Sequence, residues 1–240
     1  MTKSLPLIWL PGLLCDGTLF EDVDQCLPEW IAPECFTLDA LPTMGQLAAD
    51  VLAKAPKEFV LGGLSMGGIL AFEVYRQAPH RVKGLILMDT NSANEKNEVS
   101  EKRNELVSRA LSGEFEQITP EVLMPLLIHP SRLEEPDLTG KIEQMAINIG
   151  LEAFQAHANA LATRPDARPF LSEISVPTIV LTGKNDLLCP IDNHLLMAQH
   201  IPDVTMHVLP SCGHLSSLEQ PEAVALRLSN WLDLYQSQWL

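Results

Sequence analysis

The sequence lacks the features that mark several classes of protein. Basic residues are scarce: 16 lysines and arginines stand against 31 acidic residues, for a formal net charge of -15. An acidic surface repels phosphate backbones and anionic lipid headgroups, so we expect neither nucleic acid nor a membrane surface as a partner. No apolar run approaches the length of a membrane span. Pro6 and Pro11 interrupt the first apolar run and no small-residue cleavage site follows it, so no signal peptide is expected.

Patterns that would indicate a metal or a cofactor are also missing. The five cysteines are odd in number and irregularly spaced, and none forms a C-x-x-C pair, which predicts reduced thiols in a cytoplasmic protein. The chain has no H-E-x-x-H motif and no carboxylate cluster, so no metal is expected. It has neither a Walker loop nor a G-x-G-x-x-G fingerprint, and no cofactor is expected.

Strand-like and helix-like segments alternate through most of the chain. Short apolar runs occur at 5–10, 35–38, 58–61, 82–88, 177–183 and 204–209. Helices are predicted between them, at 18–27, 44–55, 68–76, 192–200 and 219–234. The predicted strands are apolar throughout rather than alternating with polar residues, which is typical of strands buried on both faces. We therefore predict an α/β fold with a mostly parallel sheet flanked by helices.

The alternation stops after Asp89. No strand is indicated from 91 to 169, where the pattern favours helices at 97–111, 120–128, 138–149 and 151–163. We predict a core formed by residues 1–90 and 170–240, interrupted by an all-helical cap insertion at 91–169.

The segment from Gly63 to Gly67 has the pattern G-x-S-x-G, with Ser65 at its centre. An apolar strand precedes it and a predicted helix follows it. A serine on a sharp strand-to-helix turn has its hydroxyl pushed out of the fold, where a base can reach it. Ser65 is therefore the predicted nucleophile.

A serine nucleophile needs a base, usually histidine, and a carboxylate that orients the base. Working residues of open α/β sheets gather at the carboxyl ends of strands. His214 lies in a loop directly after the last predicted strand and is the predicted base. Asp186 follows the strand before it and is the favoured acid. Asp89 also follows a strand and preserves the order serine, acid, histidine, so order alone does not decide; its alternative role is to hydrogen-bond the loop at the root of the insertion.

Acyl transfer also needs backbone donors for the oxyanion. One is the N–H after the nucleophile, here that of Met66, and the other comes from the loop after the first strand. We assign the second donor to Leu13, with Leu14 as a substitute, because Gly12 allows the chain to turn there.

With these residues in view, the chain resembles the α/β-hydrolase superfamily over almost its whole length. The resemblance rests on Leu10-Pro11-Gly12, the Ser65 turn, Asp186, His214 and the helical insertion. Where the family usually has His-Gly in the early loop, this chain has Pro-Gly, which leaves the backbone donors intact. Residues 213–222 are similar to the small-ester and lactone branch, which includes 3-oxoadipate enol-lactonases, the pimeloyl carrier-protein methyl esterase and MenH-like enzymes. Members of that branch carry a four-helix cap over the site.

The chemistry and the resemblance together predict a serine hydrolase that cleaves a small to medium carboxylic ester, lactone or thioester through an acyl-enzyme on Ser65. An acyltransferase, a C–C bond hydrolase or a MenH-like lyase would use the same triad. A non-catalytic ligand-binding receptor on this fold is the alternative from another class, and it predicts a damaged triad. Candidates for substrate contact are Leu14, Met124, Leu127, Met145 and Phe154, although those in the insertion could equally form its own core.

Overall fold

A parallel sheet forms the centre of the computed structural model, which describes residues 4–240. Within those residues the sheet has six strands in the order β2-β1-β3-β4-β5-β6, and each neighbouring pair is parallel. The strands are β1 (Leu5–Leu10), β2 (Ile31–Cys35), β3 (Phe59–Leu64), β4 (Val82–Met88), β5 (Thr178–Gly183) and β6 (Val204–Leu209). The predicted α/β fold is confirmed.

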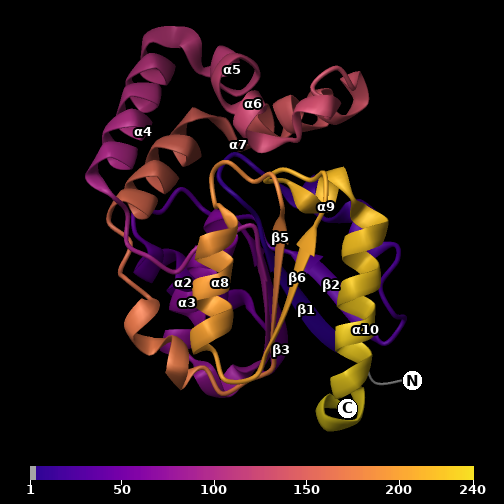
Figure 1. Ribbon diagram of the computed structural model, residues 1–240. Coiled ribbons are helices and arrows are strands. Elements are labelled where there is room, and N and C mark those ends of the chain that lie inside the picture. Colours follow the sequence, from indigo (N-terminus) through magenta and orange to yellow (C-terminus); the bar gives the residue numbers. More distant parts are fainter. Residues whose placement is uncertain (1–3) are drawn as a thin grey trace.

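Helices cover both faces of the sheet (Figure 1). Leu7 and Trp9 of β1 pack on one face with α1 (Glu21–Asp24) and α10 (Pro221–Trp239). Ile8 and Leu10 pack on the other face with α2 (Met44–Lys54), α3 (Met66–Gln77) and α8 (Ile191–His200). Burial on both faces explains why the four inner strands, β1, β3, β4 and β5, are almost entirely apolar, whereas the edge strands β2 and β6 are more exposed and carry polar residues. A short helix, α9 (Ser216–Glu219), directly precedes α10. None of the helices in residues 4–240 is both long enough and apolar enough to cross a membrane.

The segment from 91 to 169, called the cap below, is described throughout and contains no strand. Its helices are α4 (Asn97–Arg109), α5 (Phe115–Ile118), α6 (Met124–Leu127) and α7 (Pro136–Ala162), joined by irregular helical turns. Gly150 interrupts α7 with a φ of 79°, which separates the two helical stretches predicted on either side of it. Figure 1 places these helices across the carboxyl ends of the strands.

Several predicted boundaries are wrong, among them three toward the ends of the chain's core. The second strand is Ile31–Cys35 rather than 35–38; it pairs only with β1 at the sheet edge, where Pro33 is tolerated. The helix predicted at 18–27 reduces to Glu21–Asp24 after a 3-10 turn. The last helix begins at Pro221, because Gln220 lies outside the helical region, at φ -141° and ψ 58°, as expected before proline.

The parallel arrangement brings the candidate residues together. Because all six strands of the described sheet run in the same direction, the segments that follow them meet at one edge. Ser65 follows β3, Asp89 follows β4, Asp186 lies in the loop after β5, and His214 lies in the loop after β6. The residues identified in the sequence therefore share the edge that the cap covers.

Candidate active site

Ser65 occupies a sharp turn between β3 and α3. Its φ of 55° and ψ of -116° lie in a region that residues with a side chain rarely adopt. The flanking glycines allow the close approach of neighbouring backbone. A Cβ on Gly63 would lie 2.3 Å from the carbonyl carbon of Gly67, and one on Gly67 would lie 1.8 Å from the carbonyl oxygen of Leu10. The Ser65 N–H donates to the carbonyl of Met88 at 2.9 Å, which ties the turn to β4.

The loop after β1 lies beside this serine. A Cβ on Gly12 would lie 3.5 Å from that of Ser65. Cys15 donates its N–H to the Gly12 carbonyl at 3.1 Å, which closes a turn over Leu13 and Leu14, and Leu14 has a φ of 60°. Met66 is the first residue of α3, where backbone N–H groups have no partner within the helix. The two predicted oxyanion donors therefore belong to segments that adjoin Ser65: Leu13 to the loop beside it, and Met66 to the start of α3.

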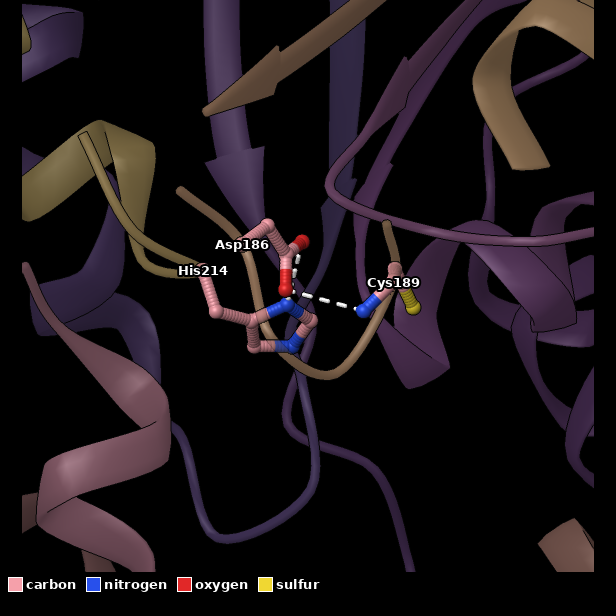
Figure 2. A group of neighbouring side chains, drawn as sticks. All are labelled: Asp186, Cys189 and His214. Atoms are coloured by element: carbon pink, nitrogen blue, oxygen red, sulfur yellow. Dashed lines mark hydrogen bonds and ion pairs between the residues drawn. The ribbon is translucent and has the colours of Figure 1, made fainter. Parts of the chain in front are cut away.

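Asp186 and His214 form a buried pair (Figure 2). The Nδ1 of His214 and the Oδ2 of Asp186 lie 2.8 Å apart. The other carboxylate oxygen, Oδ1, accepts the N–H groups of Leu188 and Cys189, each at 2.8 Å. The carboxylate is thus fixed by the loop it belongs to, and it holds the imidazole in the tautomer that leaves Nε2 free to accept a proton.

Burial acts against charge on both members of this pair, but their mutual attraction outweighs it. Burial by itself would raise the pKa of Asp186, whereas the charge and hydrogen bond of His214 and the two backbone N–H groups hold that pKa below its usual value. Burial would lower the pKa of His214, whereas the charge and hydrogen bond of Asp186 raise it. The pair is electrostatically suited to stabilise an imidazolium.

Asp89 makes different contacts. Its Oδ1 accepts the N–H of Gly183 at 2.9 Å, and its Oδ2 accepts the N–H of Ser216 at 3.3 Å and shares a short hydrogen bond with the Ser216 hydroxyl. Complete burial and the nearby charge of Asp186 raise the pKa of Asp89 to about 8. The Asp89 carboxyl group is largely protonated at neutral pH, and its hydrogen bonds go to Gly183 and Ser216 rather than to the imidazole. It is therefore poorly suited to be the anion that orients His214.

The sequence did not predict a hydrogen-bonded layer that lies behind the site. Thr90 donates its hydroxyl to the carbonyl of Ser65 at 2.7 Å and its N–H to Nε2 of His194 at 2.9 Å. Burial lowers the pKa of His194 to about 4, so this imidazole is neutral and can accept that bond. The available signal was the position of Thr90, two residues past the end of β4 at the functional edge.

The structure brings Asp186 and His214 into contact and places Ser65 at the same sheet edge. Within residues 4–240 no hydrogen bond joins the Ser65 hydroxyl to His214. Catalytic hydrogen bonds are commonly longer without substrate and tighten when it binds.

The thiol of Cys189 lies beside the pair, and Asp186, Cys189 and His214 offer ligand atoms within 4.8 Å of one another (Figure 2). The donor set does not fit a metal. Burial and the charge of Asp186 raise the pKa of the Cys189 thiol, so it stays protonated, whereas a metal binds the thiolate. The Nδ1 of His214 is already committed to Asp186. We propose no metal at this position.

Most of the residues predicted to contact the substrate are buried in hydrophobic clusters. Leu14 and Phe154 lie in one cluster with cap residues, whereas Met124 and Met145 extend the cluster that includes α1 and α10. Leu127 is half-buried, and its carbonyl accepts the N–H groups of both His214 and Leu215 at 3.0 Å. The cap therefore contacts the histidine loop through its backbone.

Several known proteins are similar to this chain. The chain is 26% identical over 217 residues to the pimeloyl-[acyl-carrier protein] methyl ester esterase of Nitrosomonas europaea, covering 82% of this chain and 79% of that protein. It is 24% identical to the 2-succinyl-6-hydroxy-2,4-cyclohexadiene-1-carboxylate synthase of Serratia proteamaculans, covering 94% and 92% of the two chains. The solved structure of a thermophilic esterase from Thermogutta terrifontis matches with a TM-score of 0.83 and 30% identity, covering 97% of this chain and 91% of that one.

The family model described as the alpha/beta hydrolase fold matches residues 36–221. That range contains the Ser65 turn, the cap, Asp186 and His214. Esterases among the relatives support hydrolase activity. The sequence resemblance is confirmed, and the chain belongs to the α/β-hydrolase family.

Proposed function

We propose that the protein is a serine hydrolase that cleaves a small to medium carboxylic ester, lactone or thioester through an acyl-enzyme on Ser65. The observation that carries this proposal is the buried Asp186–His214 pair at the sheet edge where Ser65 occupies its strained turn. These are the three groups that acyl transfer by a serine requires, in the order serine, acid, histidine. All three residue types are present, which argues against a non-catalytic receptor.

In the first half of the reaction, Nε2 of His214 takes the proton of the Ser65 hydroxyl as its oxygen attacks the carbonyl carbon. The carbonyl electrons move onto oxygen, and the N–H groups of Leu13 and Met66 stabilise the resulting oxyanion. Asp186 stabilises the imidazolium. Collapse of the tetrahedral intermediate breaks the bond to the leaving group, which takes the proton from His214 and departs as an alcohol or thiol.

In the second half, His214 removes a proton from water, whose oxygen attacks the acyl carbon. Collapse of the second intermediate releases the carboxylic acid and returns the proton to Ser65 through His214. A lactone follows the same steps, but its leaving alcohol remains part of the released acid.

The cap is the proposed roof of the substrate site, and residues 1–90 and 170–240 are the proposed catalytic core. Leu14 supports the proposal that the cap roofs the site. It belongs to the loop that carries the proposed oxyanion donor, and it packs with Phe154 of the cap. The proposed partner is a small molecule, whose acyl group would lie between the cap and the sheet edge.

A lyase that uses the same triad is the second candidate. The similarity to the synthase of Serratia proteamaculans over 94% of this chain supports it. Formation of acid from a generic ester, with water as the only acceptor, would favour hydrolysis over both lyase chemistry and transfer to another alcohol.

The test combines active-site labelling with a substrate panel. A fluorophosphonate should label Ser65 in the wild-type protein and leave Ser65→Ala unlabelled, with the modified peptide identified by mass spectrometry. Turnover should then be measured on p-nitrophenyl esters of increasing chain length, lactones and acyl thioesters. Absence of labelling in the folded wild-type protein would contradict the proposal.

A further inference from the structure

A buried carboxylate joins the cap to the loop that carries His214. Glu219 is 6% exposed. Its Oε1 accepts the N–H of Gly213 at 2.7 Å, and its Oε2 accepts the N–H of His129 at 2.8 Å. Gly213 immediately precedes the histidine, whereas His129 belongs to the cap. The Glu219 side chain therefore joins two segments: His129 lies 90 residues from Glu219 in the sequence, and Gly213 lies 6 residues from it.

Three further contacts reinforce this connection. The N–H groups of His214 and Leu215 both donate to the carbonyl of Leu127 at 3.0 Å. Arg132 of the cap donates from Nη1 to the backbone carbonyl of Glu219 in a short hydrogen bond. We call this set of contacts between residues 127–132 and 213–219 the clasp.

The clasp leaves little space between its two sides. A Cβ on Gly213 would lie 2.7 Å from the nitrogen of His129 and 2.8 Å from Oε1 of Glu219. A shift of the cap segment therefore presses on, or pulls away from, the backbone beside His214. A buried carboxylate costs free energy unless its partners satisfy it, and here the N–H groups of Gly213 and His129 do so; an apolar side chain would leave both donors without an acceptor.

We propose that Glu219 is a positioning residue that couples the cap to His214, so that residues 127–132 help to place the imidazole for proton transfer. The inference rests on the proposed function, since it takes His214 as the general base. Glu219 acts through Gly213 and the backbone of the histidine rather than on the substrate. Misplacement of a catalytic group by about 1 Å can cost about a hundredfold in rate, so a connection of this kind is enough to control activity.

The first test compares Glu219→Gln with Glu222→Gln. Glutamine keeps the shape of the side chain but replaces one carboxylate oxygen by an NH₂ group, which cannot accept the second N–H. We expect kcat on a p-nitrophenyl ester to fall about tenfold in Glu219→Gln, with KM within about threefold of wild type. Glu222 is exposed on α10, three residues away, and its variant should retain wild-type kinetics.

The second test acts from the cap side and leaves Glu219 intact. His129 has a φ of -60°, which proline adopts without strain. His129→Pro replaces the donating N–H by the ring and forces this contact open, whereas His129→Ala retains the N–H. We expect His129→Pro to reproduce the fall in kcat and His129→Ala to stay within about threefold of wild type. This pair decides the matter if Glu219→Gln fails to fold.

Hydrogen exchange supplies a readout that does not depend on catalysis. In Glu219→Gln, amide exchange should rise in both 127–132 and 212–216, because each segment loses the same restraint. A wild-type protein that turns over no ester would contradict the proposed function alone, and the exchange of the two segments would still support or exclude the clasp.

Two outcomes would overturn the proposal. One is a kcat within twofold of wild type in both Glu219→Gln and His129→Pro. The other is a loss of activity that matches the fraction of unfolded molecules measured by circular dichroism, which would make Glu219 a residue of stability only.

Discussion

Backbone strain in this protein is concentrated at single residues along the functional edge. In the described part of the chain, four non-glycine residues have a positive φ: Leu14, Ser65, Asp89 and Ser211. They follow β1, β3, β4 and β6, respectively. Each such conformation costs about 1–3 kcal/mol and persists only where the surroundings impose it. The strain coincides with the segments that carry the proposed nucleophile, the proposed base and the proposed oxyanion donors.

The two candidate acids are separable by substitution. Asp186→Asn should lower kcat by about 10⁴, because the amide no longer stabilises the imidazolium or selects its tautomer. Asp89→Asn should stay within about tenfold of wild type, because Asp89 is already largely protonated at neutral pH and asparagine resembles the neutral acid. Steady-state kinetics at pH 7 checks both variants. The opposite ranking would show that Asp89 is the acid.

The pH profile of activity should report His214. Its neutral form is the base, so kcat/KM rises as the imidazole loses its proton. Because the charge of Asp186 outweighs burial and raises the pKa of His214, the midpoint of this rise should lie above 6.5, the ordinary value for histidine. A midpoint below 6.5, measured with a substrate that does not itself ionise, would show that burial dominates.

Asp89 also predicts how stability depends on pH. Its folded pKa, about 8, lies above the value of about 4 expected in the unfolded chain, so the folded state binds more protons between these values. This group therefore makes the protein less stable as the pH rises from about 4 to 8. In Asp89→Asn that contribution disappears, and the melting temperature relative to wild type should rise toward pH 8. A difference that is constant over this range would contradict the raised pKa.

At the scale of elements, the apolar patterns predict the existence of the strands better than their ends. The strand predicted at 58–61 extends through Gly62 and Gly63 to Leu64, because pairing with β1 and β4 stabilises residues that have little preference for a strand. Phe36 and Leu38 are buried in the loop after β2, which explains why their apolar character resembled a strand. Local patterns report burial, and tertiary pairing decides the boundary.

The two ends of the cap are joined by a buried ion pair network. Glu95, just before α4, accepts hydrogen bonds from Arg103 of α4 and from Arg164, just after α7. The Glu95 side chain is 0% exposed and that of Arg164 is 7% exposed. The network therefore fixes the entry and exit of the cap relative to each other.

Removal of this carboxylate should destabilise the protein strongly. Glu95→Ala leaves Arg164 buried without its ionic partner, which typically costs about 3–5 kcal/mol. The free energy of unfolding from urea denaturation measures the loss. Glu101→Ala, at an exposed position on α4, is the matched control and should change stability by less than about 0.5 kcal/mol. Equal effects of the two substitutions would exclude a special role for the network.

At the scale of the whole molecule, the net charge of -15 acts against the compact state. Raising the ionic strength from about 0.01 M to 0.15 M shortens the screening length from about 30 Å to about 8 Å and weakens this repulsion. We expect the melting temperature to rise over that range. A fall in melting temperature would mean that attraction within the surface ion pairs stabilises the protein by more than repulsion among the excess acidic residues destabilises it.

Much of the site follows from the sequence alone. The G-x-S-x-G turn, a histidine after the last strand and an aspartate after the strand before it are local patterns, and the parallel sheet implied by apolar strands brings them to one edge. These features depend on residues close together in the chain, so they could be identified without the fold.

The sequence favoured Asp186 over Asp89, but only the tertiary structure gives each of them its partner and brings Glu219 against the cap. Both aspartates follow strands, and what separates them is the partner that each carboxyl group finds: His214 for one, Gly183 and Ser216 for the other. The contact between Glu219 and His129 spans 90 residues. Contacts of this kind depend on how the cap and the sheet pack together, which no local pattern encodes.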